Sequence, residues 1–396
     1  MASGLEQYDY DLGLDGPVLT LHRHHGVLYA GTYAGLFRLQ PGERTGELAH
    51  FSPVPSMPTP CWGLETVGDE LWAVTARALE RLPDDGGLQI ETRLREVYSI
   101  LKTADERHVF IGTERSGVLR MRPKDGGSPD FEPIAGTAGE VRFLVEDPSG
   151  KVWLSQRFEG AFRLARIDPD DPDRPARIYG SEDGVPGNGL LLQPFVWNGG
   201  VYAANDSTFL RLDEERDAFV VEEALIDSRY PEGTVNHVHA DPNGGLWLAR
   251  GPHVPLTLVT RDAEGKTHFR YPLLGAGPHD YQSVLYEEST STVWAGAAAG
   301  ELISWRIGPA LQTAPALASR IRSIELLESG PVDRQGSEIP FSGETLRFEY
   351  ALPHFDTIDG NRYQSRLLGL DEHWGPWSAE TYRDFAGLRE GSYSFE

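Results

Sequence analysis

An all-β fold, a seven-bladed β-propeller followed by a small immunoglobulin-like β-sandwich, is predicted by three features of this 396-residue sequence. A short apolar run that carries one aromatic residue recurs seven times along the chain. The 44 glycines, 28 prolines and 10% aromatic residues are typical of short strands joined by many turns. From Ile321 onward the repeat stops, and longer alternating segments replace it.

The repeated run reads VLYAGT at 27–32 and LWLAR at 246–250, with five equivalents between or after them. Its aromatic residues lie 38 to 49 residues apart, a period that favours propeller blades over a helical solenoid. An alternating strand and a turn precede each run, and a further strand such as GLFRL follows it. We therefore expect the aromatic residues on the second strand of each blade, buried between blades rather than exposed to a ligand. They are Tyr29, Trp72, Phe110, Trp153, Tyr202, Trp247 and Trp294.

The repeats assign residues 1–310 to the propeller. The seventh unit lacks a fourth strand, because PALQTAPALAS after residue 308 does not alternate. EQYDYDL at 6–12 does alternate, so we expect it to supply the outer strand of blade seven and to close the ring. Residues 311–320 are predicted as a linker and 321–396 as the sandwich. The last residues stop inside an expected strand, so we expect the sandwich to be truncated.

Charge and cysteine content exclude several classes of partner and site. The net charge of −24 and the isoelectric point near 4.9 argue against nucleic acid or an anionic membrane as the main partner. Cys61 is the sole cysteine, which excludes a disulfide framework and a cysteine-based zinc site. No signal-peptide pattern and no apolar run of about 18–20 residues is present, so we expect no membrane contact by this segment.

Candidate metal and catalytic residues are few. His22 with His24, and His237 with His239, alternate along strands, but neither pair has an identifiable third ligand. Strand packing or channel lining is the interpretation we adopt for them. The run DPDDPDRP at 168–175 lacks the spacing of an EF-hand and is predicted as a solvated loop. Neither a phosphate loop nor a nucleophile elbow is found, so we predict no catalytic residue, no metal and no cofactor.

Four arginines follow the second strand of their blades at nearly equivalent places. Turns at that position and the connections between blades emerge at the same end of a propeller. Four arginines gathered at that end would concentrate positive potential there. A guanidinium binds a carboxylate, sulfate or phosphate through two parallel hydrogen bonds, so one interpretation is a site for an anionic ligand such as an acidic oligosaccharide. The other is that they are solvated turn residues or partners of nearby Asp and Glu. The four are Arg77, Arg115, Arg157 and Arg250.

The C-terminal segment carries the most specific motifs, LRFEYAL at 346–352, YQSRLLGLDEHW at 363–374 and LREGSYSF at 388–395. This order resembles the three-tyrosine domain that follows regulator-propeller repeats in the sensor regions of hybrid two-component systems. IYGSEDGVPGNGLLL at 178–192 resembles the blade-to-blade signature of those propellers. Either Tyr382 or Phe385 is the third aromatic residue of the motif. The matching residues are Tyr363, Gly369, Asp371, Trp374, Gly391, Tyr393 and Phe395.

The resemblance implies a non-enzymatic, ligand-sensing module of a two-component or related transmembrane signalling protein. It places the chain in the periplasmic or extracellular part of a membrane-anchored bacterial protein, with a kinase, cyclase or transcription-regulator output elsewhere. A small-molecule or oligosaccharide ligand, anionic in the first interpretation above, and a homodimer formed through the sandwich are the expected partners. Such proteins commonly carry two propellers, whereas this chain carries one. Two alternatives stay open, a propeller lyase acting on an acidic polysaccharide and a protein-binding scaffold.

Overall fold

The structure is a computed structural model that describes residues 5–42, 48–55, 57–82, 89–91, 94, 96–124, 127–171, 173–206, 208–230, 234–251, 254–271, 280–307, 319–332, 339, 341–351 and 362–396. The chain divides into two compact units. The larger unit comprises Gly4–Pro272 and Pro278–Ile307, and the smaller unit contains Gly308–Glu396. Most of the linker predicted at 311–320 lies outside the described residues. No helix within the described ranges is long and apolar enough to cross a membrane.

The described part of the larger unit forms seven antiparallel sheets of four strands each, numbered here from sheet 1 to sheet 7. The strands of sheets 1 to 3 are β2 (Val18–His24), β3 (Val27–Thr32), β4 (Leu36–Gln40) and β5 (His50–Pro53); β6 (Cys61–Val67), β7 (Glu70–Thr75), β8 (Leu79–Leu82) and β9 (Gln89–Glu91); and β10 (Val97–Lys102), β11 (Val109–Thr113), β12 (Val118–Lys124) and β13 (Gly127–Pro133). The strands of sheets 4 to 6 are β14 (Leu144–Glu146), β15 (Val152–Phe158), β16 (Ala161–Ile167) and β17 (Arg177–Tyr179); β18 (Leu192–Trp197), β19 (Gly200–Asn205), β20 (Thr208–Asp213) and β21 (Ala218–Val221); and β22 (Val235–Ala240), β23 (Leu246–Arg250), β24 (Thr257–Arg261) and β25 (Thr267–Arg270). Sheet 7 combines β26 (Tyr281–Glu287), β27 (Thr292–Ala297) and β28 (Leu302–Arg306) with β1 (Leu5–Tyr8) from the start of the chain.

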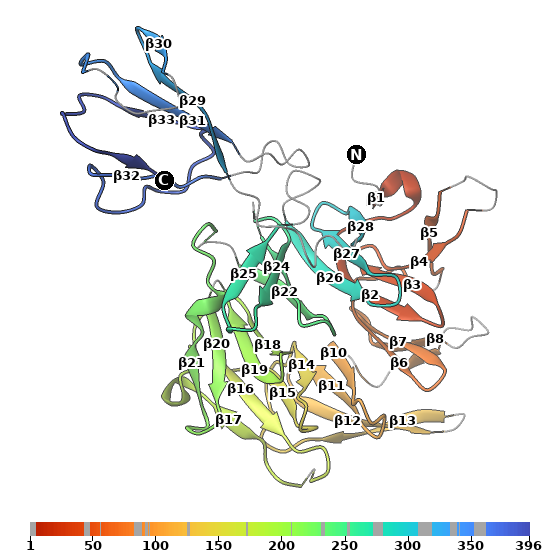
Figure 1. The fold of residues 1–396 in the computed structure, drawn as a ribbon. Helices are drawn as coiled ribbons and strands as arrows, with labels where there is room; N and C mark the ends of the chain where they lie inside the picture. The colour runs from red at the N-terminus through yellow and green to blue at the C-terminus, as the bar shows by residue number, and fades with distance from the viewer. Residues whose placement is uncertain are drawn as a thin grey trace. The chain divides into compact units, whose positions relative to one another are not determined.

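The seven sheets are arranged in a ring. The first strand of each sheet contacts the first strand of the next one, and β26 of sheet 7 contacts β2 of sheet 1. The later strands of each sheet lie progressively farther from the centre of the ring (Figure 1). This arrangement fits a β-propeller, whose sheets pack face to face around a common axis.

The N-terminal strand completes sheet 7. β1 pairs antiparallel with β28 from Leu5↔Trp305 to Tyr8↔Leu302. It ends at Tyr8 rather than continuing to residue 12, because a 3-10 helix, η1 (Tyr10–Leu12), follows it. The carboxylate of Asp9 accepts the backbone N–H of the second helical residue, and a left-handed glycine ends the helix.

The seven repeated aromatic residues all lie on second strands and are at most 8% exposed, as predicted. In sheet 4 the carboxylate of Asp147 accepts two N–H groups of its own turn and the indole N–H of Trp153, at 2.7 Å. In sheet 6 Asp241 does the same for Trp247, at 2.9 Å. One carboxylate therefore closes the Asp-Pro-x-Gly turn and also satisfies a buried indole, which explains why this turn precedes a tryptophan.

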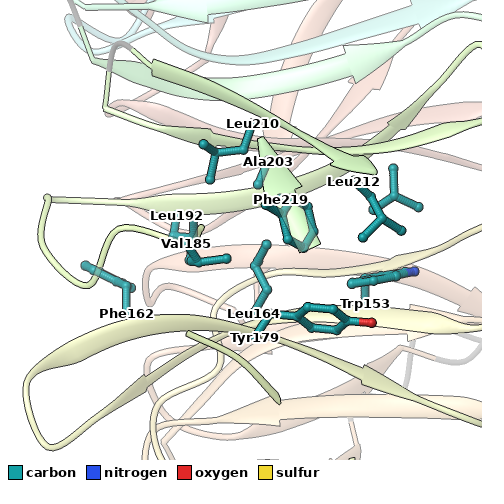
Figure 2. Packing of buried hydrophobic residues seen from close by; sticks show 11 residues of the cluster. Trp153, Phe162, Leu164, Tyr179, Val185, Leu192, Ala203, Leu210, Leu212 and Phe219 are labelled. Atoms are coloured by element: carbon teal, nitrogen blue, oxygen red, sulfur yellow. The ribbon is translucent and has the colours of Figure 1, made fainter. Parts of the chain in front are cut away.

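The junction between sheets 4 and 5 has a distinctive packing (Figure 2). The ring of Tyr179 lies 5.2 Å from that of Trp153 and meets Phe219 edge-on at 5.6 Å. A second 3-10 helix, η2 (Ser181–Asp183), follows and ends at Gly184, which has φ +81°. A Cβ at Gly184 would lie 2.0 Å from the carbonyl oxygen of Phe219, so the chain passes too close for any other residue.

The junction between sheets 7 and 1 repeats this packing. Tyr8 lies 5.9 Å from Trp294 and meets Phe51 edge-on at 5.5 Å. Gly13 has φ +80°, and a Cβ there would lie 2.1 Å from the carbonyl oxygen of Phe51. β1 is therefore the structural equivalent of β17, although it comes from the start of the chain and the other three strands of its sheet come from residues 281–306.

The described part of the smaller unit forms two sheets. One has the order β30 (Gly330–Pro331), β29 (Arg320–Leu326), β31 (Leu346–Ala351) and β33 (Tyr382–Phe385), and the other pairs β32 (Leu367–Leu368) with β34 (Ser394–Phe395). Phe348 of the first sheet stacks on Phe395 of the second, with ring centres 4.3 Å apart. Phe385 joins this core, whereas Tyr382 is 39% exposed. The remaining described 3-10 helix, η3 (Glu223–Leu225), belongs to the larger unit.

The motif Leu-x-Gly-x-Asp in the smaller unit has a structural explanation. Asp371 accepts the backbone N–H of Leu367 at 2.8 Å, and its own N–H returns to the carbonyl of Leu367. Gly369 takes φ +94° within this turn, and Arg383 pairs with the Asp371 carboxylate at 3.0 Å. This turn ends β32 after two residues.

Candidate functional site

One end of the ring gathers the turns between second and third strands and the connections that lead into first strands. In six of the seven sheets, a backbone N–H of this turn, or in sheet 4 of the end of the second strand, donates to a carbonyl of the connection into the same sheet, at 2.8–3.1 Å. We call this the connection end of the ring. The donor–acceptor pairs are Tyr33–Pro17, Ala76–Pro60, Glu114–Glu96, Arg157–Glu140, Gly251–Thr234 and Ala298–Asp280.

These hydrogen bonds fix the relative positions of the four predicted arginines. Arg157 itself donates the shared bond, whereas Arg77 and Arg115 each lie one residue after the donor. Arg250 lies one residue before it. Arg77, Arg115 and Arg157 are exposed at the connection end of three consecutive sheets, 2, 3 and 4. The four arginines therefore occupy three different places relative to the donor, and two of them, Arg157 and Arg250, lie within the second strands β15 and β23.

Arg250 differs from the other three because it is buried. It is the last residue of β23, faces Val235 across the sheet and is 3% exposed. Burial lowers its pKa, and the nearby carboxylate of Asp227 opposes that effect. In sheets 2 and 3 the same position holds Thr75 and Thr113, whose hydroxyls bind carbonyls of the following turn. Arg250 thus does not share the exposed surface of the other predicted residues.

Glutamates accompany the exposed arginines. Arg115 lies 3.6 Å from Glu96, and both side chains are more than half exposed, so this ion pair is weak. The guanidinium of Arg157 lies 5.5 Å from the centre of the Phe162 ring. Pairing with an acidic neighbour, the second interpretation of the turn arginines, therefore applies to Arg115.

A repeated β-bulge lies beside these turns. In five sheets the first strand contains one extra residue relative to the second strand, immediately after its first paired residue. Sheet 4 has the same irregularity, because Glu140↔Arg157 and Leu144↔Leu154 leave one residue too many on the first-strand side. Sheet 5 pairs without interruption. The extra residues are Leu19, Trp62, Tyr98, Asn236 and Gln282, and in sheet 4 the irregularity lies within residues 141–143, which include Arg142.

Sequence reasoning missed these residues. A bulge inserts one residue and re-aims a side chain, and such features occur often beside functional sites. The signal available in the sequence is one break in the alternation of apolar and polar residues along a first strand. In CWGLETV the break falls at Trp62 and Gly63. The register of the partner strand is needed to recognise such a break as a bulge, because a polar residue at a core position interrupts the alternation in the same way.

The histidine pairs take part in contacts between sheets. His22 Nε2 and His24 Nδ1 both bind the Thr66 hydroxyl, at 2.8 and 3.0 Å, which joins β2 to β6. Burial lowers the pKa of His22 to about 4 and that of His237 to about 4. His237 Nδ1 accepts the backbone N–H of Val284 at 3.4 Å. Within the described ranges, no group of three or more His, Cys, Asp or Glu residues is placed to hold a metal ion.

A cavity of about 530 Å³ lies at the opposite end of the ring, between sheets 3 and 4. Its walls are turn residues 103–108, 146–151 and 169–170. Arg107 pairs there with Asp105 at 2.5 Å and with Asp170 at 2.9 Å, so these charges largely neutralise one another. The run DPDDPDRP, predicted as a solvated loop, contributes part of this wall through Asp170.

Comparison with known proteins places the fold. No protein-family model and no curated protein matches this sequence. The extracellular domain of the hybrid two component system BT3049 from B. thetaiotaomicron is similar over 99% of this chain, with a TM-score of 0.68 and 14% identity. That of BT4673 from the same organism is similar over 100% of this chain, with a TM-score of 0.58 and 15% identity. The chain spans 54% and 56% of these two domains, about half of each.

A second kind of neighbour matches a smaller part of the chain. A catalytically inactive virginiamycin B lyase from Staphylococcus aureus, solved with quinupristin, covers 77% of this chain with a TM-score of 0.56 and 11% identity, and the match spans 99% of the lyase. The lyase thus matches less of this chain than the two sensor domains do. Along nearly its whole length, this chain has the fold of the extracellular domains of hybrid two-component systems.

Proposed function

We propose that this chain is the extracytoplasmic ligand-sensing part of a two-component or related transmembrane signalling protein, and that it is not itself an enzyme. The observation that carries the proposal is the extent of the structural likeness. The two sensor domains match 99–100% of the chain, the smaller unit included, whereas the lyase matches 77%. A smaller unit attached to a propeller has no role in the lyase alternative, but it has one in signalling.

The finer architecture belongs to this proposal. The seven sheets are the seven blades of one propeller, because their first strands contact one another in a closed ring. The smaller unit is an immunoglobulin-like sandwich, since its two sheets share the core of Phe348, Phe385 and Phe395. In a signalling protein the propeller binds the ligand and the sandwich passes the change toward the membrane.

The ligand site is placed at the connection end, where Arg77, Arg115 and Arg157 are exposed on neighbouring blades. These guanidinium groups offer cationic contacts to an anionic ligand, which would compete with Glu96 for Arg115. Each binds a carboxylate or sulfate through paired hydrogen bonds. Arg250 supports this end of blade six from inside, next to Asp227.

The test is a thermal-stability screen against neutral and anionic oligosaccharides, with absorbance at 230–240 nm recorded for unsaturated products. A ligand at one hundred times its Kd stabilises the folded state by about 2.7 kcal/mol, which gives a measurable shift. We expect stabilisation by an anionic oligosaccharide without product. Arg77→Gln, Arg115→Gln and Arg157→Gln should each reduce the shift. Arg216→Gln, at an exposed turn between third and fourth strands, is the matched control.

Each other result has a definite meaning. Unsaturated product would refute the non-enzymatic proposal and favour the lyase. Stabilisation that the three substitutions leave unchanged would move the site away from the connection end. The absence of a shift with any oligosaccharide would favour a protein partner and the scaffold alternative.

A further inference from the structure

Side chains from the irregular first strands of sheets 2, 3 and 4 lie next to one another. The rings of Trp62 in sheet 2 and Tyr98 in sheet 3 lie 6.3 Å apart, tilted by 47°. The guanidinium of Arg142 in sheet 4 lies 5.1 Å from the centre of the Tyr98 ring. The indole N–H of Trp62 donates to the carbonyl of Val97 at 2.9 Å, which fixes the first ring in place. We call Trp62, Tyr98 and Arg142 the ladder.

Folding alone does not require the ladder. The equivalent bulges in sheets 1, 6 and 7 contain Leu19, Asn236 and Gln282, so the bulge forms with apolar or amide side chains as well. Among these irregular first strands, two aromatic residues followed by a cation are found in the neighbouring sheets 2, 3 and 4. Trp62 and Tyr98 are only partly buried, and 47% of the Arg142 side chain is exposed.

Polar groups surround the ladder. Glu140 forms an ion pair with Arg142, and Glu96 lies at the connection into the strand of Tyr98. Burial raises the pKa of Tyr98, the charges of Glu114, Glu140 and Glu96 raise it further, and that of Arg142 lowers it. Through its ion pair with Arg142, Glu140 supplies hydrogen-bond acceptors beside the ladder, as is common in sites for small ligands.

We propose that the ladder is the contact surface for a ligand that combines a flat ring with a carboxylate. The ring lies against Tyr98 and Trp62, while the carboxylate binds Arg142 through two parallel hydrogen bonds. Glu140 accepts hydrogen bonds from ligand hydroxyls. Both a uronic acid, whose sugar ring has an apolar face, and an aromatic carboxylate have this chemistry. The inference rests on the proposed sensing function and names residues and a ligand class for it.

The experiment is a calorimetric titration of the full chain with three probes, namely digalacturonate, its neutral counterpart galactobiose, and benzoate. We expect at least one carboxylate to bind and galactobiose to bind more weakly. Preference for digalacturonate assigns a sugar ligand, and preference for benzoate assigns an aromatic one. Failure of both carboxylates to bind would overturn the inference, because the ligand class itself would then be wrong.

Variants locate the binding. Tyr98→Ala and Arg142→Gln should each weaken binding of the preferred carboxylate about tenfold or more, whereas Tyr98→Phe, which keeps the ring, should restore it. Gln282→Ala, at an equivalent bulge outside the ladder, should leave the affinity unchanged. If Tyr98→Ala fails to fold, Arg142→Gln still tests the proposal, because the Arg142 side chain is exposed and its replacement should not unfold the protein. Carboxylate binding that survives Arg142→Gln and Tyr98→Ala would overturn the ladder while leaving the sensing function intact.

Discussion

Replacing Gly184 with alanine tests the packing that joins one sheet to the next. Gly184 has φ +81°, a region in which alanine costs about 1–2 kcal/mol relative to its preferred conformations. Its added Cβ would also lie 2.0 Å from the backbone oxygen of Phe219, about 1 Å inside the shortest tolerated contact. Because a backbone atom cannot rotate away, β21 must shift, and overpacking of this kind costs about 1–3 kcal/mol. We expect a total loss of about 2–5 kcal/mol.

Gly199→Ala is the matched control, since Gly199 has φ +80° and nothing lies within 4 Å of its added Cβ. It should lose only the conformational part, about 1–2 kcal/mol. The larger unit has roughly 300 residues, for which 1 kcal/mol corresponds to about 2 °C in Tm. Denaturant titration and thermal melting of both variants measure the difference directly.

Gly13→Ala extends the test to ring closure. The Cβ would lie 2.1 Å from the Phe51 oxygen, so Gly13→Ala should match Gly184→Ala rather than Gly199→Ala. If Gly184→Ala and Gly199→Ala were equally destabilised, the close approach to Phe219 would carry no cost and the reasoning would be refuted. If Gly13→Ala lost no more stability than Gly199→Ala while Gly184→Ala lost the larger amount, β1 would not contribute to the ring as β17 does.

Substitutions at three further residues address buried polar groups. Asp241→Ala should destabilise by about 1–3 kcal/mol because it leaves the buried Trp247 indole unpaired. Asp241→Asn should also destabilise, because its single amide oxygen cannot accept both the turn N–H groups and the indole N–H; an unchanged free energy of unfolding in denaturant titrations would contradict the role of this hydrogen bond. Burial raises the pKa of Glu80, so its contribution to stability is present at low pH and lost as pH rises through the folded-state pKa; Glu80→Gln should therefore stabilise more at pH 8 than at pH 4. The pKa of His237 is lowered to about 4, so the protein should lose up to about 3 kcal/mol as pH falls from 6.5 to 4, and a His237→Gln variant that kept the full slope would disprove this assignment.

The sheets are predictable from the sequence because each second strand has an aromatic residue that must fill the same closely packed space between two sheets. A side chain as large as Trp153, packed between sheets, tolerates little change, so its period survives in the sequence. The N-terminal strand is predictable for a related reason, since an unpaired fourth position in sheet 7 leaves an exposed edge. Its end at Tyr8 is not predictable from alternation, because EQYDYDL alternates through a 3-10 helix.

The candidate site is predicted less well. Counting residues from the aromatic places Arg157 and Arg250 near one another in the repeat, yet the turns differ in length and Arg250 falls inside the sheet. A shift of one residue in a strand reverses the direction of its side chain, so approximate equivalence in sequence does not give equivalence in space. The bulge at Tyr98 and the irregularity around Arg142 are harder still, because they are defined by the partner strand.

The connection end combines a constant backbone with varied side chains, and this contrast is a reason for proposing the ligand site there. Six sheets make the same hydrogen bond there through backbone atoms alone, so the donor residue can be of any class. It is in fact tyrosine, alanine, glutamate, arginine, glycine and alanine in turn. At the second strands the reverse holds, because every repeat there has an aromatic residue that fills the space between sheets. Side chains released from packing are the ones that selection for a ligand can change without unfolding the ring. The exposed arginines and the ladder both lie where that freedom exists, and the cavity at the opposite end, whose Arg107 is held by two aspartates, does not have it.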